Sequence, residues 1–299
     1  MTSGLGDGWK VGHWTDAGAR TGCTVLLPPQ GNVCSCDIRG SSPSSRELVL
    51  LHPDRRLTEV HGILLTGGSA FGLAAADGVV GWLEERGIGY DTTIARVPIV
   101  PAAVVFDLGA GNPDVRPGPE QGRSACEVAA EGIPPRGAVG AGAGATVGKW
   151  AGREHGVAGG FGFGVAEESG LRAAAVAVVN AVGDVLADDG SVLAGTTAPG
   201  PVRSSPARPA TPLPANTVLA LVAVEGAFEK REVRWLAGRG SDGITVSVRP
   251  AHTRYDGDVV FAVATPGPAP SSAADLDVLG PLATMAVAAA VRDAVEPHG

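Results

Sequence analysis

The Asn216–Thr217 junction places a hydroxyl side chain at the start of an apolar run. Proline-rich residues precede it, and residues 218–224 are only Val, Leu and Ala. A chain that cut itself before Thr217 would expose an α-amine, whose ordinary pKa of about 7.7–8.0 leaves part of it neutral at neutral pH. Such an amine can take the proton of the neighbouring hydroxyl, so one residue would supply both nucleophile and base. Taken alone, the dipeptide is more often an ordinary loop-to-strand boundary.

Asp256 and Asp258 form an Asp-Gly-Asp sequence just before another apolar run. At this turn-to-strand junction the two are expected to share one face, because side chains on a strand repeat every two residues. Two carboxylates that lie so close together raise each other's pKa unless a cation or hydrogen-bond donors compensate. Lys149, at the end of a loop of small residues, is the candidate cation, and His252 is a candidate helper. A solvated turn and a surface lysine are the alternative interpretations.

Asn180 ends the apolar run 173–179, where its amide is a candidate oxyanion donor. Its alternative role is to form a turn, since Gly183 and Asp184 follow shortly afterwards. The six histidines are scattered without the spacing of metal ligands. We therefore expect chemistry that uses neither a metal nor another cofactor.

Apolar runs and turn signals predict the elements that position these residues. Strands are predicted at about 24–27, 62–66, 173–179, 217–225, 244–249 and 258–264, and helices at about 227–239 and 273–294. Residues 195–215 are rich in Pro, Ser, Thr and Arg and are predicted to be an exposed linker. Because strands and helices interleave, a layered α/β or α+β sandwich is expected.

Glycine-rich segments at 67–72, 137–149 and 159–164 have two interpretations. Such loops can cradle phosphate or a dinucleotide, but the first lacks the P-loop lysine and the second lacks a clear βαβ unit. Close approach of the backbone to another strand or to a substrate is the better account.

Composition excludes several classes of protein. The net charge is −8 without any basic run, which argues against nucleic-acid binding. No apolar run reaches the roughly 18 residues of a membrane span, and the N-terminus lacks the apolar core of a signal peptide, so a cytoplasmic protein is expected. Cys23, Cys34, Cys36 and Cys126 are expected to be reduced, small apolar residues.

Several segments together resemble the DmpA-type aminopeptidase family, which includes β-peptidyl aminopeptidases and nylon-oligomer (6-aminohexanoate oligomer) endohydrolases. The matching segments run in order from residue 11 to about 265: 11–13, 21–25, 37–40, 65–73, 97–108, 145–149, 216–217 and 252–258. A Thr nucleophile and the Asp-Gly-Asp sequence make the chain more similar to the nylon-oligomer branch.

The resemblance implies an α+β fold, an αββα four-layer sandwich like that of N-terminal-nucleophile hydrolases. It implies one domain, residues 1–299, that cleaves itself between Asn216 and Thr217 into chains 1–216 and 217–299 and assembles as a tetramer of such pairs. Thr217, Lys149, Asn180, Asp256 and Asp258 fall on catalytic positions. The implied substrates are short peptides or oligoamides.

Phe106 departs from the family pattern, in which Tyr is frequent at the corresponding position. Loss of the phenolic hydroxyl removes a possible donor to the substrate and affects the expected rate or substrate class. Three alternatives remain open: a β- or D-aminopeptidase of the same family, an acyltransferase of the ornithine acetyltransferase type, and an uncleaved binding protein on the same fold.

Overall fold

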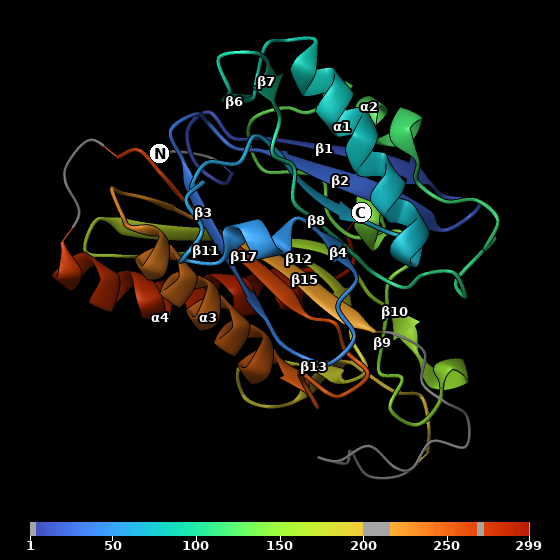
Figure 1. Cartoon of the computed structure of the whole chain (residues 1–299). Coiled ribbons are helices and arrows are strands. Elements are labelled where there is room, and N and C mark those ends of the chain that lie inside the picture. The colour runs from blue at the N-terminus through green and yellow to red at the C-terminus, as the bar shows by residue number, and fades with distance from the viewer. Residues whose placement is uncertain (1–3, 200–215, 268–271, 299) are drawn as a thin grey trace.

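Two five-stranded sheets lie face to face, and a pair of helices covers the outer side of each (Figure 1). The computed structural model describes residues 4–199, 216–267 and 272–298. The order of layers is helices, sheet, sheet, helices, so the predicted αββα sandwich is confirmed. Within the described residues, no helix has the length and apolarity needed to cross a membrane.

The first sheet is built mainly from the N-terminal part of the chain. Its strand order is β1 (Lys10–Asp16), β2 (Thr21–Leu27), β5 (Ile63–Thr66), β8 (Ala102–Val104) and β4 (Ser45–Arg46). Helices α1 (Ala75–Glu84) and α2 (Pro119–Glu127) cover its outer face. All neighbouring pairs are antiparallel except β5 and β8.

The second sheet carries the predicted cleavage junction at its centre. Its order is β11 (Gly160–Glu168), β12 (Leu171–Asn180), β15 (Thr217–Glu225), β17 (Val259–Thr265) and β3 (Val33–Ile38). Only β15 and β17 are parallel. Helices α3 (Lys230–Ser247) and α4 (Ala273–Asp293) cover its outer face.

Short elements complete the described chain. The minor strands are β6 (Tyr90–Asp91) with β7 (Arg96–Val97), β9 (Thr146–Val147) with β10 (Val157–Ala158), and β13 (Asp184–Leu186) between β14 (Val192–Ala194) and β16 (Val248–Arg249). The 3-10 turns are η1 (Leu48–Leu51), η2 (Ser69–Ala74), η3 (Gly140–Gly142) and η4 (Arg153–His155).

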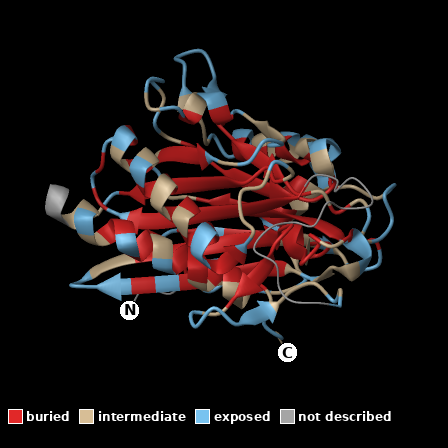
Figure 2. Cartoon of the chain, turned by 90° about the horizontal axis from the view of Figure 1, so that it is seen from below, coloured by how far each residue is buried: buried red, intermediate tan, exposed pale blue. Residues whose placement is uncertain are grey.

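Apolar residues on both faces of β15 explain why an uninterrupted apolar run forms a strand here. Val218, Ala220 and Val222 pack toward α3 and α4, whereas Leu219 and Leu221 pack toward the first sheet. Alternate side chains leave a strand on opposite faces, so a strand between two layers must be apolar at every position. The burial of the central strands is visible in Figure 2.

Glycines of β11 allow α4 to lie directly on the sheet. A Cβ added at Gly162 or Gly164 would overlap the carbonyl oxygens of Ala290 and Ala286 in α4, and one added at Gly160 would overlap that of Ala294, which follows the helix. The glycines recur every two residues because they share one face of the strand, and the carbonyl oxygens they meet recur every four residues because those share one face of the helix. The backbone thus approaches closely here, as predicted, but the partner is a helix and not another strand or a substrate.

Helix α3 corrects the prediction for residues 227–249. It runs from Lys230 to Ser247, so residues 244–247 are helical and only Val248–Arg249 form a strand. Gly240 and Gly243 weaken helical propensity, but they sit against side chains of the sheet and against the backbone of α4. Tertiary packing that requires small residues overrides the local preference.

The glycine-rich loop at residues 67–72 encloses a carboxylate of the protein itself. Asp107 accepts hydrogen bonds from the Gly68 N–H and the Thr21 hydroxyl, each at 2.7 Å. Its side chain fills the space at Gly67, which agrees with close packing in this loop. The four cysteines are free and buried, as expected for small apolar residues.

Candidate active site

Thr217 is the first residue of β15, and its neighbours come from segments far apart in the sequence. Asn180, the last residue of β12, is its partner across the ladder, and Asn216 bridges to Asp256. Lys149 reaches the same place from the loop after β9. All five residues named here are buried, with at most 5% of their surface exposed.

The carbonyl group of Asn216 is held between a hydroxyl and a backbone amide. The Thr217 hydroxyl donates to the Asn216 oxygen at 2.5 Å, and the Gly257 N–H donates to the same oxygen at 2.8 Å. The Asn216 N–H in turn donates to the Tyr255 carbonyl. Gly257 lies so close to Ser42 that a Cβ would contact the Ser42 backbone, which explains a glycine between the two aspartates.

Asp258 holds the strand that begins at the junction. One of its oxygens accepts from the Val218 N–H at 2.6 Å, and the other accepts from His252 Nδ1 at 2.6 Å. Burial alone would lower the pKa of His252, but the hydrogen bond to Asp258 and its charge raise it. The contact with Asp258 thus favours the protonated imidazolium of His252, which forms an ion pair with Asp258 in that state.

Asp256 lies in a different environment. Its carboxylate accepts from the Thr253 N–H at 2.8 Å and the Thr253 hydroxyl at 2.5 Å, and more weakly from the Val182 N–H at 3.4 Å. Burial and the charge of Asp258 raise the pKa of Asp256 to about 6. Among the described residues Asp256 has no cationic partner within hydrogen-bond distance, so its carboxylate is stabilised only by these donors.

Lys149 is buried against an amide rather than against a carboxylate. Its Nζ lies 2.9 Å from Asn180 Oδ1 and 3.2 Å from the Asn180 carbonyl oxygen. Burial lowers the pKa of Lys149 to about 7, although Asp256 partly opposes the shift. Within the described chain Lys149 forms no ion pair with Asp256 or Asp258. Of the two aspartates, only Asp256 acts on the charge of Lys149, from beyond ion-pair distance.

Asn180 uses its amide to connect three segments. Nδ2 donates to the Phe106 carbonyl at 3.3 Å, and Oδ1 accepts from Lys149 and from the Thr146 N–H at 3.0 Å. These contacts hold Lys149 and β9 against the end of β12. The predicted oxyanion donor is therefore already engaged with a backbone carbonyl.

Comparison with known proteins identifies the family. The sequence profile of peptidase family S58 matches residues 7–297. The chain belongs to peptidase family S58. An uncharacterized aminopeptidase of Mycobacterium tuberculosis is 39% identical over 283 residues, which cover 86% of this chain and 79% of the relative. The 6-aminohexanoate-oligomer endohydrolase of a Kocuria species is 31% identical over 258 residues, covering 82% and 69%.

A solved structure supports the fold of this S58 peptidase. The L-aminopeptidase D-Ala-esterase/amidase of Ochrobactrum anthropi, described as a variant of the Ntn hydrolase fold, has a TM-score of 0.73. The match covers 98% of this chain and 86% of that one at 18% sequence identity. The chain is thus a peptidase-family protein with the sandwich that its sequence predicts.

The structure also brings in groups that the sequence did not single out. The Gly257 N–H donates to the Asn216 carbonyl at the junction. Thr253 donates to Asp256, and the Thr146 N–H donates to Asn180. Of these groups, only Gly257 could have been found from the sequence, because it is the central residue of the Asp-Gly-Asp sequence. Asp256 and Asp258 precede β17 instead of lying in it, so they converge through a turn and not through strand alternation.

Phe106 lies at the edge of the site. Its carbonyl accepts from Asn180, and its ring faces the guanidinium of Arg153 at 5.7 Å from the ring centroid. Of the expected linker 195–215, residues 200–215 lie outside the described residues. Before them, the Thr196 and Thr197 N–H groups donate to Asp184 and to the His155 carbonyl.

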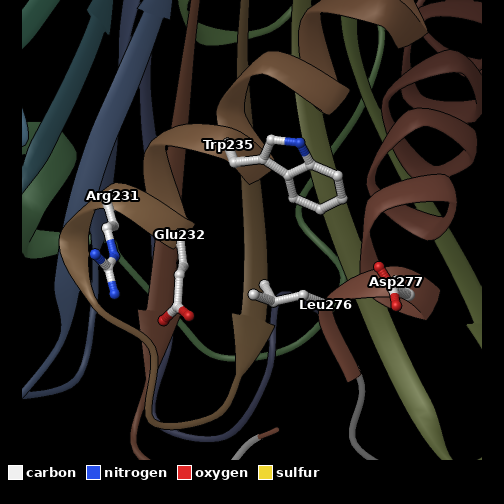
Figure 3. A pocket seen from close by; sticks show the side chains of 5 residues that line it. All are labelled: Arg231, Glu232, Trp235, Leu276 and Asp277. Carbon is white, nitrogen blue, oxygen red and sulfur yellow. The ribbon is translucent and has the colours of Figure 1, made fainter. Parts of the chain in front are cut away.

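A separate pocket of about 480 Å³ lies on the outer helical layer of the peptidase. Arg231, Glu232, Trp235, Leu276 and Asp277 line it where α3 and α4 begin (Figure 3). None of these five side chains is a hydroxyl, thiol or imidazole nucleophile. The chemical groups that suit amide hydrolysis are those gathered around Thr217.

Proposed function

We propose that this S58 peptidase cleaves itself between Asn216 and Thr217 and then hydrolyses amides with Thr217 as its N-terminal nucleophile. The observation that carries the proposal is the Asn216 carbonyl, which contacts the Thr217 hydroxyl and accepts from the Gly257 N–H. A nucleophile and an oxyanion donor thus meet at one peptide bond. The products would be chains 1–216 and 217–299.

In the cleavage step, Thr217 Oγ1 attacks the Asn216 carbonyl carbon. The Gly257 N–H stabilises the charge that develops on the carbonyl oxygen, an effect of about 3–4 kcal/mol for a good donor. The C–N bond breaks, the Thr217 nitrogen gains a proton, and an ester links Asn216 to the side chain. Water then hydrolyses the ester and leaves a free α-amine at Thr217.

Lys149 is the proposed proton acceptor for this first step. The α-amine does not exist before cleavage, so another base must take the hydroxyl proton. With a pKa lowered to about 7, Lys149 is largely neutral above that pH and able to accept a proton. Asn180 orients its amine through two contacts.

In the hydrolysis step, the α-amine of Thr217 takes the hydroxyl proton and Oγ1 attacks a substrate amide. The leaving amine departs with a proton, and water hydrolyses the acyl-enzyme. Asp258 fixes the start of β15 through the Val218 N–H, and Asp256 stabilises the positive charge of Lys149. Backbone N–H groups complete the oxyanion environment, and Asn180 joins them when its amide leaves the Phe106 carbonyl.

Short peptides or oligoamides, such as 6-aminohexanoate oligomers, are the proposed substrates. The Kocuria relative carries the oligomer activity in its name, and the mycobacterial relative is described as an aminopeptidase. The second candidate is a β- or D-aminopeptidase of the same family, and the higher identity to the mycobacterial relative supports its aminopeptidase character. A tetramer of cleaved pairs and a cytoplasmic location form part of the proposal.

Mass spectrometry under denaturing conditions tests the nucleophile. We expect two chains that meet at 216/217 in the wild type and one intact chain in Thr217→Ala, because alanine has no hydroxyl to attack the carbonyl. Thr217→Ser is the matched control and is expected to cleave. An intact, active wild-type chain, or cleavage of Thr217→Ala, would contradict the proposal.

A further inference from the structure

Arg153 presents a guanidinium beside the proposed nucleophile site. It lies in the turn η4, and its guanidinium faces the ring of Phe106 and packs on Gly109. The Phe106 carbonyl accepts from Asn180, which pairs with Thr217 across the ladder. Phe106 therefore lies between the Arg153 guanidinium and the side-chain amide of Asn180, which is paired with Thr217 of β15.

The charge of Arg153 also reaches Lys149. The Gly152 N–H donates to the Lys149 carbonyl at 3.0 Å, which folds the turn back toward the lysine. Arg153 contributes to the lowered pKa of Lys149, after burial and against the opposing effect of Asp256. The contacts of Arg153 with Phe106 and Gly109 and its proximity to Lys149 place this cation next to the site.

No carboxylate in the described ranges forms an ion pair with Arg153. This is notable in a chain of net charge −8, in which Arg39, Arg123 and Arg234 all contact carboxylates. Arg153 is exposed, and a cation–π contact leaves guanidinium N–H groups available at the ring edge. It is therefore accessible to an anionic ligand.

Two further arginines belong to or contact residues 106–117, the segment that begins at Phe106. Arg20 Nη1 donates to the Ala110 carbonyl at 3.2 Å, and the Arg116 guanidinium lies 4.1 Å from the centroid of the Phe71 ring. Neither forms an ion pair with a described carboxylate. Asp107 anchors the segment through its bonds to Thr21 and Gly68. Three arginines, Arg20, Arg116 and Arg153, thus belong to or contact this segment, which also carries the exposed Asp114, and Glu154 follows Arg153.

We propose that Arg153 binds the free carboxylate end of the substrate and so selects short amino-acid oligomers with an ionised C-terminus. The inference rests on the proposed function, because it places that end relative to a Thr217 nucleophile. The guanidinium is suited to a carboxylate, which accepts two parallel N–H bonds. Asp256 and Asp258 are buried and bonded inside the protein, so they are not positioned to anchor the amine end.

Hydrolysis of one oligomer in two forms tests the inference. The linear 6-aminohexanoate trimer is offered as the free acid and as the C-terminal primary amide, and kcat and KM are measured for each. For the wild type we expect kcat/KM to favour the acid about tenfold, mainly through KM, because a charged hydrogen bond is lost in the amide. Arg153→Gln should lose this preference, and Arg153→Lys should keep part of it.

Arg231→Gln is the matched control, since Arg231 is an exposed arginine on the outer helical layer. Its acid-to-amide ratio should equal that of the wild type. Equal kcat/KM for the two forms in the wild type, turnover of neither form, or an unchanged ratio in Arg153→Gln would overturn the inference. Cleavage at 216/217 is scored in every variant, so a failure of the proposed function shows separately as an uncut chain.

Discussion

Lys149 carries a pKa of about 7, because burial disfavours its charged form more strongly than Asp256 favours it. As the pH rises through this value, the side chain loses its proton and becomes able to accept one. Asp256, with a pKa raised to about 6, changes charge just below that range. Two groups of the site therefore titrate close to neutral pH.

Self-cleavage should accelerate as the pH rises through about 7 and then level off. The freshly translated chain, quenched at intervals and separated on a denaturing gel, gives the rate at each pH. Lys149→Met should slow cleavage by about 10²–10⁴-fold, the usual contribution of a general base. Lys10→Met, at an exposed lysine of β1, should cleave normally. A flat profile between pH 6 and 8 would contradict the role of Lys149.

Among the elements, β11 and α4 show how small residues set the thickness of a layer. Three glycines of the strand face three turns of the helix, and the backbones touch without side chains between them. Gly81 in α1 is different, because an added Cβ would meet no atom within 4 Å. The same substitution should thus have opposite effects in the two outer layers.

Gly162→Ala should destabilise the fold by about 1–3 kcal/mol, because its methyl group overlaps the Ala290 carbonyl of α4. Gly81→Ala should stabilise it by about 0.5–1 kcal/mol through helical propensity. The two variants are compared by their thermal unfolding midpoints. These are measured in the Thr217→Ala background, which keeps one covalent chain. A midpoint for Gly162→Ala at or above that of Gly81→Ala would refute this packing argument.

For the whole molecule, the sheet order interleaves the two proposed chains. Strands β15 and β17, from residues 217–299, lie between β12 and β3, from residues 1–216. Helix α4 packs on β11 and β12, so the second chain also covers strands of the first. Cutting one bond at the start of β15 leaves every one of these contacts in place.

The two chains should therefore remain together after cleavage. Size-exclusion chromatography in native buffer should give one peak that contains both, at the elution volume of uncut Thr217→Ala. Urea should separate them, because denaturant exposes the shared core. Separate elution of the chains in native buffer would show that the interleaved sheet does not hold them.

Local patterns were sufficient for much of the fold. The apolar runs at 173–179 and 217–225 became β12 and β15, and the expected terminal helix became α4. A strand buried on both faces must be apolar throughout, so its sequence reveals it without knowledge of its neighbours. The sequence also indicated a special junction at Asn216–Thr217 and a family in which Lys149 and Asn180 lie near it.

Contacts between distant segments were decided only in the tertiary structure. Helix α3 continues to Ser247, and within it Gly243 lies against the backbone of α4, a contact that local propensity cannot predict. The pKa values of Lys149 and Asp256 depend on burial, and the donor at the Asn216 carbonyl is the backbone of Gly257, which no side-chain motif announces. The sequence by itself determined which residues are available for chemistry. The packing of the layers determines the charge state and the hydrogen-bond partners of these residues. Both depend on burial and on contacts between segments that only folding brings together.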